Sequence, residues 1–159
     1  MIFDLCHVVN MFVSKQAQDV FRITNLFIPI PALHCYNSNL PFACCLVATF
    51  VVSVLNWKYF IHGSLMHHLD KVAVCVTLAC VFVQDTGLMH CIPVLLLTHI
   101  CGRHRYYTQK PKNAAQWHCV FRYVAFWICY FHATKGVGIL AFCLYSIVYV
   151  RCCMDLFVF

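Results

Sequence analysis

Charged residues are scarce in this chain, and glutamate is absent from it. The sequence of 159 residues holds 11 lysines and arginines and 5 acidic residues, all of which are aspartates. Charged residues make up 10% of the chain, against roughly a quarter in an ordinary soluble domain, so charge is too sparse to cover a water-exposed surface. Because 63% of the residues are hydrophobic, the lipid bilayer is the expected solvent for most of the chain.

Several motifs of soluble enzymes and nucleic-acid-binding proteins are also missing. The 13 cysteines include no C-x-x-C pair, which is the commonest spacing of zinc and redox sites. The 5 glycines do not fall at the spacings of a phosphate-binding loop or a dinucleotide-binding fingerprint. The net charge of +6 includes no long basic run. We therefore expect no nucleic-acid partner, and we expect most cysteines to pack as small hydrophobic residues between helices.

Long uncharged runs can be compared with the roughly 20 residues that a helix needs to cross a hydrocarbon core of about 30 Å. Residues 40–61 meet that length and end at an interfacial Trp57-Lys58 pair. The following run is too long for one upright helix and contains the turn-like sequence Gln84-Asp85-Thr86-Gly87. It is predicted to form two short helices, with a single tilted helix as the alternative; the two helices cover residues 72–83 and 88–101.

Two further apolar runs, residues 117–133 and 136–153, complete the predicted membrane domain, which covers residues 40–159. Residues 1–39 contain Pro29 and Pro31, which interrupt a helix. This part is predicted to be an amphipathic or partly inserted segment, with a first transmembrane span as the alternative. The expected fold class is all-α, a multipass transmembrane bundle with four or five membrane helices.

Residues 102–116 form the most basic segment and contain no acidic residue; its cations are Arg103, Arg105, Lys110 and Lys112. Short basic loops between membrane spans stay in the cytoplasm and contact anionic lipid, so this loop and the C-terminus are predicted to be cytoplasmic. Cys152 and Cys153 would then lie near the inner leaflet. Juxtamembrane cysteines are candidates for lipidation, although an incidental placement also fits a cysteine-rich chain.

The densest polar cluster lies between two apolar runs, at residues 62–71. On a helix, four of its side chains would share one face: Ser64, His67, His68 and Lys71. Asp70 follows His67 by three residues, and imidazole and carboxylate groups bind Zn²⁺, so His67, His68 and Asp70 are candidate metal ligands. The alternative is a solvated interfacial segment in which Asp70 caps the next helix.

The same cluster is similar to part of the CREST group of membrane hydrolases, which includes alkaline ceramidases, adiponectin receptors and hemolysin III type proteins. Ser64 with His68 resembles the serine and histidine of one family helix, and Asp70 before residues 72–83 resembles the aspartate that opens the next. The resemblance covers about 20 residues and implies zinc-dependent amide hydrolysis, with Ser64, His68 and Asp70 as the catalytic residues. The chain departs from the family in its very short loop and in lacking a downstream His-x-x-x-His pair.

Three functions are compatible with these observations. The favoured one is a membrane component without catalysis or cofactor, with the bilayer, itself or other membrane proteins as partners. A CREST-like zinc hydrolase is the second. The third is a small transporter or ion-conducting oligomer, which would require one interior surface to be lined by Asp85, His90, His99 and Arg122.

Overall fold

The computed structural model describes residues 15–58, 64–107, 111–135 and 138–157, and within these ranges it contains helices and turns but no strand. The all-α prediction is confirmed. The elements, in chain order, are α2 (Lys15–Asn25), α3 (Pro29–Cys35), α4 (Leu40–Lys58), α5 (Leu65–Gln84), the 3₁₀ helix η1 (Thr86–Cys91), α6 (Ile92–Tyr107), α7 (Pro111–Thr134) and α8 (Ile139–Phe157).

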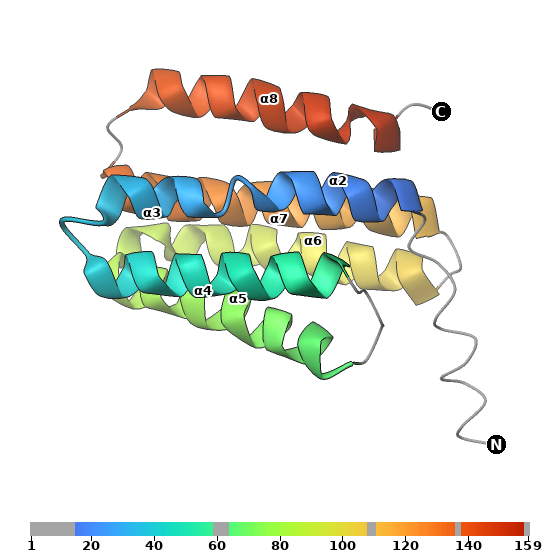
Figure 1. Cartoon of the computed structure of the whole chain (residues 1–159), viewed down its shortest axis with the longest axis horizontal. Coiled ribbons are helices and arrows are strands. Elements are labelled where there is room, and N and C mark those ends of the chain that lie inside the picture. Colours follow the sequence, from blue (N-terminus) through green and yellow to red (C-terminus); the bar gives the residue numbers. More distant parts are fainter. Residues whose placement is uncertain (1–14, 59–63, 108–110, 136–137, 158–159) are drawn as a thin grey trace.

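The helices lie lengthwise beside one another, with α7 in the middle of the bundle (Figure 1). Helix α7 packs against α2, α3, α5, α6 and α8, whereas α4 packs mainly against α5 and α3. Helices α2 and α3 follow one another along α7 and together run the length of the bundle. Successive long helices alternate in direction, so α2, α5 and α7 begin at the end where α4, α6 and α8 finish.

A turn just before Pro29 separates α2 from α3, and Pro31 lies inside α3. Residues 26–28 form a turn, in which the backbone N–H of Ile28 donates to the carbonyl oxygen of Asn25 at 3.0 Å. Pro29 then opens α3, where its missing donor is harmless because a first helical turn leaves its N–H groups unpaired. The helix is therefore interrupted just before Pro29, as predicted, whereas Pro31 is accommodated in the first turn of α3 and does not interrupt it.

Helix boundaries elsewhere differ from the sequence prediction. Helix α5 begins at Leu65, seven residues before the predicted start at 72, because Ser64 caps it: the Ser64 Oγ accepts from the backbone N–H of His67 at 3.2 Å. Helix α6 continues to Tyr107 and α7 begins at Pro111, so most of the predicted loop 102–116 is helical. The sequence Gln84–Gly87 ends α5 and leads through η1 into α6, as the two-helix alternative required.

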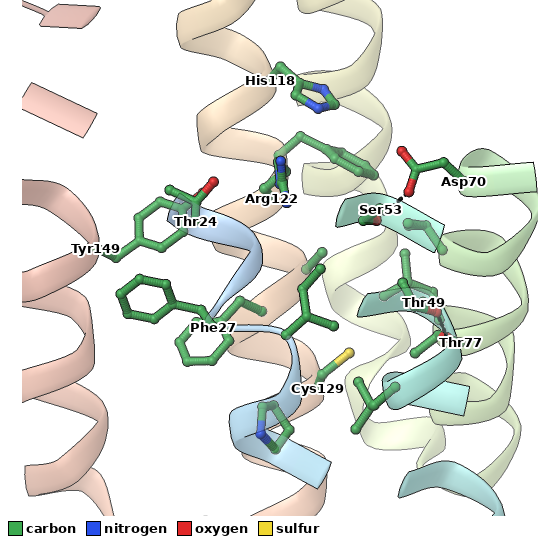
Figure 2. A pocket seen from close by; sticks show the side chains of 18 of the residues that line it. Thr24, Phe27, Thr49, Ser53, Asp70, Thr77, His118, Arg122, Cys129 and Tyr149 are labelled. Atoms are coloured by element: carbon green, nitrogen blue, oxygen red, sulfur yellow. Dashed lines mark hydrogen bonds between the residues drawn. The ribbon is translucent and has the colours of Figure 1, made fainter. Parts of the chain in front are cut away.

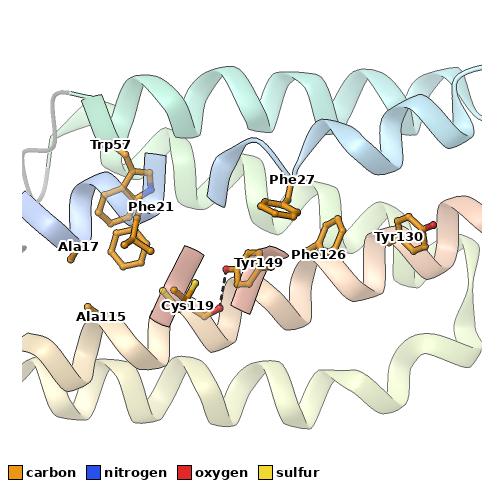
Figure 3. Close-up of a cluster of buried hydrophobic side chains, with 11 residues drawn as sticks. Ala17, Phe21, Phe27, Trp57, Ala115, Cys119, Phe126, Tyr130 and Tyr149 are labelled. Atoms are coloured by element: carbon orange, nitrogen blue, oxygen red, sulfur yellow. Dashed lines mark hydrogen bonds between the residues drawn. The ribbon is translucent and has the colours of Figure 1, made fainter. Parts of the chain in front are cut away.

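Aromatic side chains hold α2, α7 and α8 together (Figure 3). The Phe27 ring packs edge-on against Phe126, with ring centroids 5.7 Å apart, and against Tyr149, at 5.2 Å. The Tyr149 hydroxyl donates to the backbone carbonyl of Cys119 at 3.1 Å, which ties α8 to α7. Each ring also buries a large apolar area inside the bundle.

The described side chains show an unusual division between interior and exterior. The buried polar residues are Thr24, Asn25, Thr49, Ser53, Asn56, Thr77, Thr98 and His132. Large apolar side chains instead lie on the outside, where Leu33 is 80% exposed, Val83 79% and Leu140 77%. Among the described helices, α4 and α5 are long and apolar enough to cross a membrane.

Candidate functional site

A line of polar side chains joins α4 to α5. The hydroxyls of Thr49 and Thr77 are hydrogen-bonded at 2.8 Å, and the Thr49 hydroxyl also lies 3.2 Å from the carbonyl oxygen of Ala73. Nearer the end of α4, Ser53 and Asn56 both donate to the carboxylate of Asp70, Asn56 through its Nδ2 at 2.9 Å. A polar side chain between packed helices is stable only when it finds such partners.

Asp70 does not cap a helix, which corrects the alternative prediction for this residue. It lies in the second turn of α5, and its carboxylate is directed at α4 rather than at the helix start. Ser64 takes the capping position instead. The reason is that Ser53 and Asn56 supply two donors to the carboxylate, which satisfies an ionised group better than an exposed helix end does.

The other residues of the predicted catalytic and metal cluster are spread over the start of α5. His68 is exposed and His67 is half-buried, with 6.0 Å between the two ring centroids. The Ser64 hydroxyl is engaged in the helix cap. Within the described ranges, no three histidine, cysteine or acidic side chains lie close enough together to hold a metal ion. The zinc site and the resemblance to the CREST group therefore stay predictions.

The four residues proposed to line a pore do not share a surface. His90 and His99 are exposed on the outside of the bundle. Asp85 lies at the end of α5, with its carboxylate 3.6 Å from the His132 Nδ1, while Arg122 lies in the interior near the opposite end. A pore lined by this set is absent from the single chain.

The remaining predicted residues concern topology and lipidation. Arg103 is exposed on the last turns of α6, whereas the side chains of Arg105 and Lys112 and the whole of Lys110 lie outside the described residues. Cys152 is partly exposed on α8. Cys153 is buried in the aromatic cluster.

The structure adds a cavity of about 90 Å³ that the sequence did not indicate. It lies between the α2–α3 break, α4, α5 and α7 (Figure 2). Its polar lining consists of Thr24, Thr49, Ser53, Asp70, Thr77, His118 and Arg122. Its apolar lining includes Phe27, Leu46, Phe126 and Cys129. Asp70, Arg122, His118 and Ser53 lie toward one end of the cavity, Thr49 and Thr77 lie level with Phe27, and most of the lining is apolar (Figure 2).

Arg122 reaches this cavity from α7. Its Nη1 donates to the backbone carbonyl of Phe21 at 3.3 Å, and its guanidinium carbon lies 5.6 Å from the Phe21 ring centroid. The same carbonyl also accepts from the Thr24 hydroxyl at 3.2 Å, so Arg122 joins α7 to the last turns of α2 at an acceptor that is already in use. The sequence indicates Arg122 only as one of four pore-lining residues, whereas in the structure it binds a neighbouring helix.

A signal for part of the cavity was present in the sequence. Thr49, Ser53 and Asn56 interrupt the apolar run of α4 at intervals of four and three residues, which places them on one helical face. Such a face within an uncharged run indicates contact with another helix. The identity of the partner, α5, was not readable from that pattern.

A second polar cluster closes the opposite end of the bundle. Asn39 and His132 both reach the side-chain oxygen of Gln84, His132 through its Nε2 at 3.2 Å. Asn39 also caps α4, because its Oδ1 accepts from the backbone N–H of Phe42 at 3.2 Å. This cluster joins α4, α5 and α7 without forming a cavity of its own.

Comparisons of the chain with protein-family models, with curated proteins and with solved structures find no match.

Proposed function

We propose that this chain is an integral multipass membrane protein without catalytic activity, which associates with itself or with other membrane proteins. The observation that supports this function is the large apolar area on the outside of the described helices, together with polar side chains that pair between helices inside a mostly apolar core. In water, exposing this much apolar surface would promote aggregation, whereas in lipid the same surface is solvated. Inside the bundle, Thr49 pairs with Thr77, and Ser53 and Asn56 pair with Asp70, between α4 and α5.

The apolar exterior extends beyond the two helices that meet the length and hydropathy required of a span. Large exposed side chains on α6 are Val94, Leu96, Leu97 and Ile100, and on α8 they are Ile139, Leu140, Leu144, Ile147, Val148 and Val150. Helix α8 packs against α2 and α7 on one side only. Its outer face can therefore contact lipid or an apolar helix of a second membrane protein.

The charges favour one orientation of the bundle in the membrane. The end at which α4, α6 and α8 finish carries Lys58, Lys71, Arg103 and Arg151, whereas Lys135 follows α7 at the opposite end. Arg22 belongs to the first end because it donates to the carbonyl oxygens of Trp57 and Lys58, each at 3.0 Å. We name this the basic end, and basic ends of membrane bundles face the cytoplasm.

Glycosylation mapping tests both membrane insertion and orientation. The sequence contains no N-x-S/T acceptor, so an acceptor carried in a short polar linker is the only one in each variant. Synthesis into microsomes should glycosylate a linker inserted after Lys135, while a matched linker between α6 and α7 stays unmodified. The chain should also resist extraction by alkaline carbonate. Extraction, or glycosylation between α6 and α7, would contradict the proposal.

Association is tested separately in micelles. The full chain should form a defined oligomer, or bind other membrane proteins, through its lipid-facing helices. Replacing Leu144 by tryptophan on the outer face of α8 should reduce a self-association that uses this face. Light scattering measures the mass, and a protein that stays monomeric and binds no other membrane protein contradicts this part.

A further inference from the structure

Asp70 and Arg122 line the same cavity from opposite sides without pairing. Among the described residues, neither side chain lies within ion-pair distance of an opposite charge. Arg122 donates to a backbone carbonyl, and the carboxylate of Asp70 accepts from two neutral side chains. Two opposite charges therefore face one small space inside an otherwise apolar bundle (Figure 2).

The hydrogen-bonding capacity of both groups exceeds what the chain satisfies. A guanidinium has five N–H donors, and an ionised carboxylate accepts about four hydrogen bonds. Among the described side chains, Arg122 uses one of its donors and Asp70 receives two bonds. In a medium of low dielectric constant, unsatisfied charged groups are costly, so an occupant that reaches both groups stabilises the bundle.

The chemistry of the walls specifies that occupant. It must present an acceptor to Arg122 and an N–H or O–H donor to Asp70. An anion would be repelled by the Asp70 carboxylate, and a cation would be repelled by the Arg122 guanidinium. At about 90 Å³ the cavity is smaller than the roughly 150 Å³ site that accommodates benzene, so the occupant is small.

We propose that this cavity is a binding site for a small, overall neutral polar solute, such as a primary amide, that bridges Arg122 and Asp70. Ordered water fills the same positions when the solute is absent. The hydroxyls of Thr49, Thr77 and Thr24 also line the cavity but already hydrogen-bond within the chain, Thr49 and Thr77 to each other and Thr24 to the Phe21 carbonyl oxygen. Most of the remaining wall is apolar, so Arg122 and Asp70 are the groups that hold the solute. The site is internal to the bundle, so it does not depend on the proposed orientation or association in the membrane.

The test uses the full chain in detergent micelles with acetamide as the probe. Trp57 lines the cavity, whereas Trp127 does not, so their indole N–H resonances serve as reporter and internal control. Acetamide should shift the Trp57 resonance in a saturable way, with a dissociation constant on the order of millimolar for so small a ligand. Acetate and methylammonium should bind at least about tenfold more weakly, as read from the same resonance. Acetate has the same sign of charge as Asp70, and methylammonium has the same sign as Arg122.

Two variants locate the binding site. Arg122→Met should weaken acetamide binding by at least about tenfold, whereas Arg151→Met, a matched change on the exposed face of α8, should leave it unchanged. Ala125→Leu fills the cavity without removing a charge and should also abolish the shift, which decides the matter if Arg122→Met does not fold. Equal shifts by all three probes, no shift by acetamide, or unchanged binding by Ala125→Leu would overturn the proposal.

Discussion

The imidazole of His132, on the last turn of α7, lies 3.2 Å from the side-chain oxygen of Gln84, on the last turn of α5. Asn39 donates to the same oxygen from the start of α4. One amide therefore connects three helices at the end of the bundle opposite to the basic end.

Replacing Gln84 by alanine should remove this connection. His132 is 2% exposed, so the loss leaves a buried ring nitrogen without its partner, and unfolding should become easier by about 1–2 kcal/mol. Thr86→Ala, an exposed change two residues later, is the matched control and should have little effect. Reversible unfolding in micelles measures both, and equal stabilities would contradict the described junction.

Ser53→Ala should destabilise the contact between α4 and α5. The change removes one of the two donors to Asp70, and hydrogen bonds between membrane helices contribute about 0.6 to 2 kcal/mol. Ser38→Ala removes only a bond to the nearby carbonyl of Cys35 and serves as the control. A double-mutant cycle with Asp70→Asn should show coupling between positions 53 and 70. Additive changes in the free energy of unfolding would contradict the contact between Ser53 and Asp70.

The thiols of Cys119 and Cys153 should form a disulfide under a mild oxidant. Cys119 on α7 and Cys153 on α8 are buried in the same aromatic cluster, where the two helices pack together. Copper phenanthroline should remove two hydrogens and join the two peptides within one chain, as mass spectrometry detects. Cys153→Ser should abolish this product. Cross-links only through the exposed Cys75 and Cys143 would contradict the packing of α8 on α7.

Gly138→Ala should destabilise the start of α8. Gly138 has a φ of +95°, and an added Cβ would lie 3.1 Å from the Tyr130 hydroxyl, which donates to the Gly138 carbonyl. Backbone strain and the displaced hydroxyl together should cost about 1–2 kcal/mol. Gly102→Ala, within α6, is the control, because its Cβ would meet Trp117 at an ordinary 3.4 Å and alanine favours a helix. Equal effects of the two changes would argue against this turn.

Much of the helix order was predictable because it depends on local chemistry. Pro29 marks the start of α3, and Gln84 to Gly87 mark the end of α5, since proline and glycine act on their immediate neighbours. The start of α5 was placed seven residues too late because the polar cluster before residue 72 was read as interfacial. Ser64 is a good helix cap, and its capping bond starts α5 even though polar residues follow it.

The cavity was not predictable because its residues come together only through packing. Arg122 binds the carbonyl of Phe21, 101 positions earlier, and no spacing rule connects such distant residues. Ser53 and Asp70 are 17 positions apart on antiparallel helices, whose register the sequence does not specify. The sequence of α4 indicates a polar face, but the charged residues near that face could be identified only from the folded structure.

Under the proposed membrane insertion, the pairing of Asp70 also bears on how the chain would enter the bilayer during synthesis. A lone aspartate costs about 2.5 to 3.5 kcal/mol at the centre of an inserting helix and less toward its ends, and Asp70 lies in the second turn of α5. Its two donors, Ser53 and Asn56, belong to the helix synthesised just before it, so α4 and α5 can leave the translocation channel as a hairpin with the carboxylate already bound. Arg122 on α7 binds the Phe21 carbonyl on α2, which is synthesised long before α7. Insertion of Arg122 would therefore depend on α2 remaining nearby.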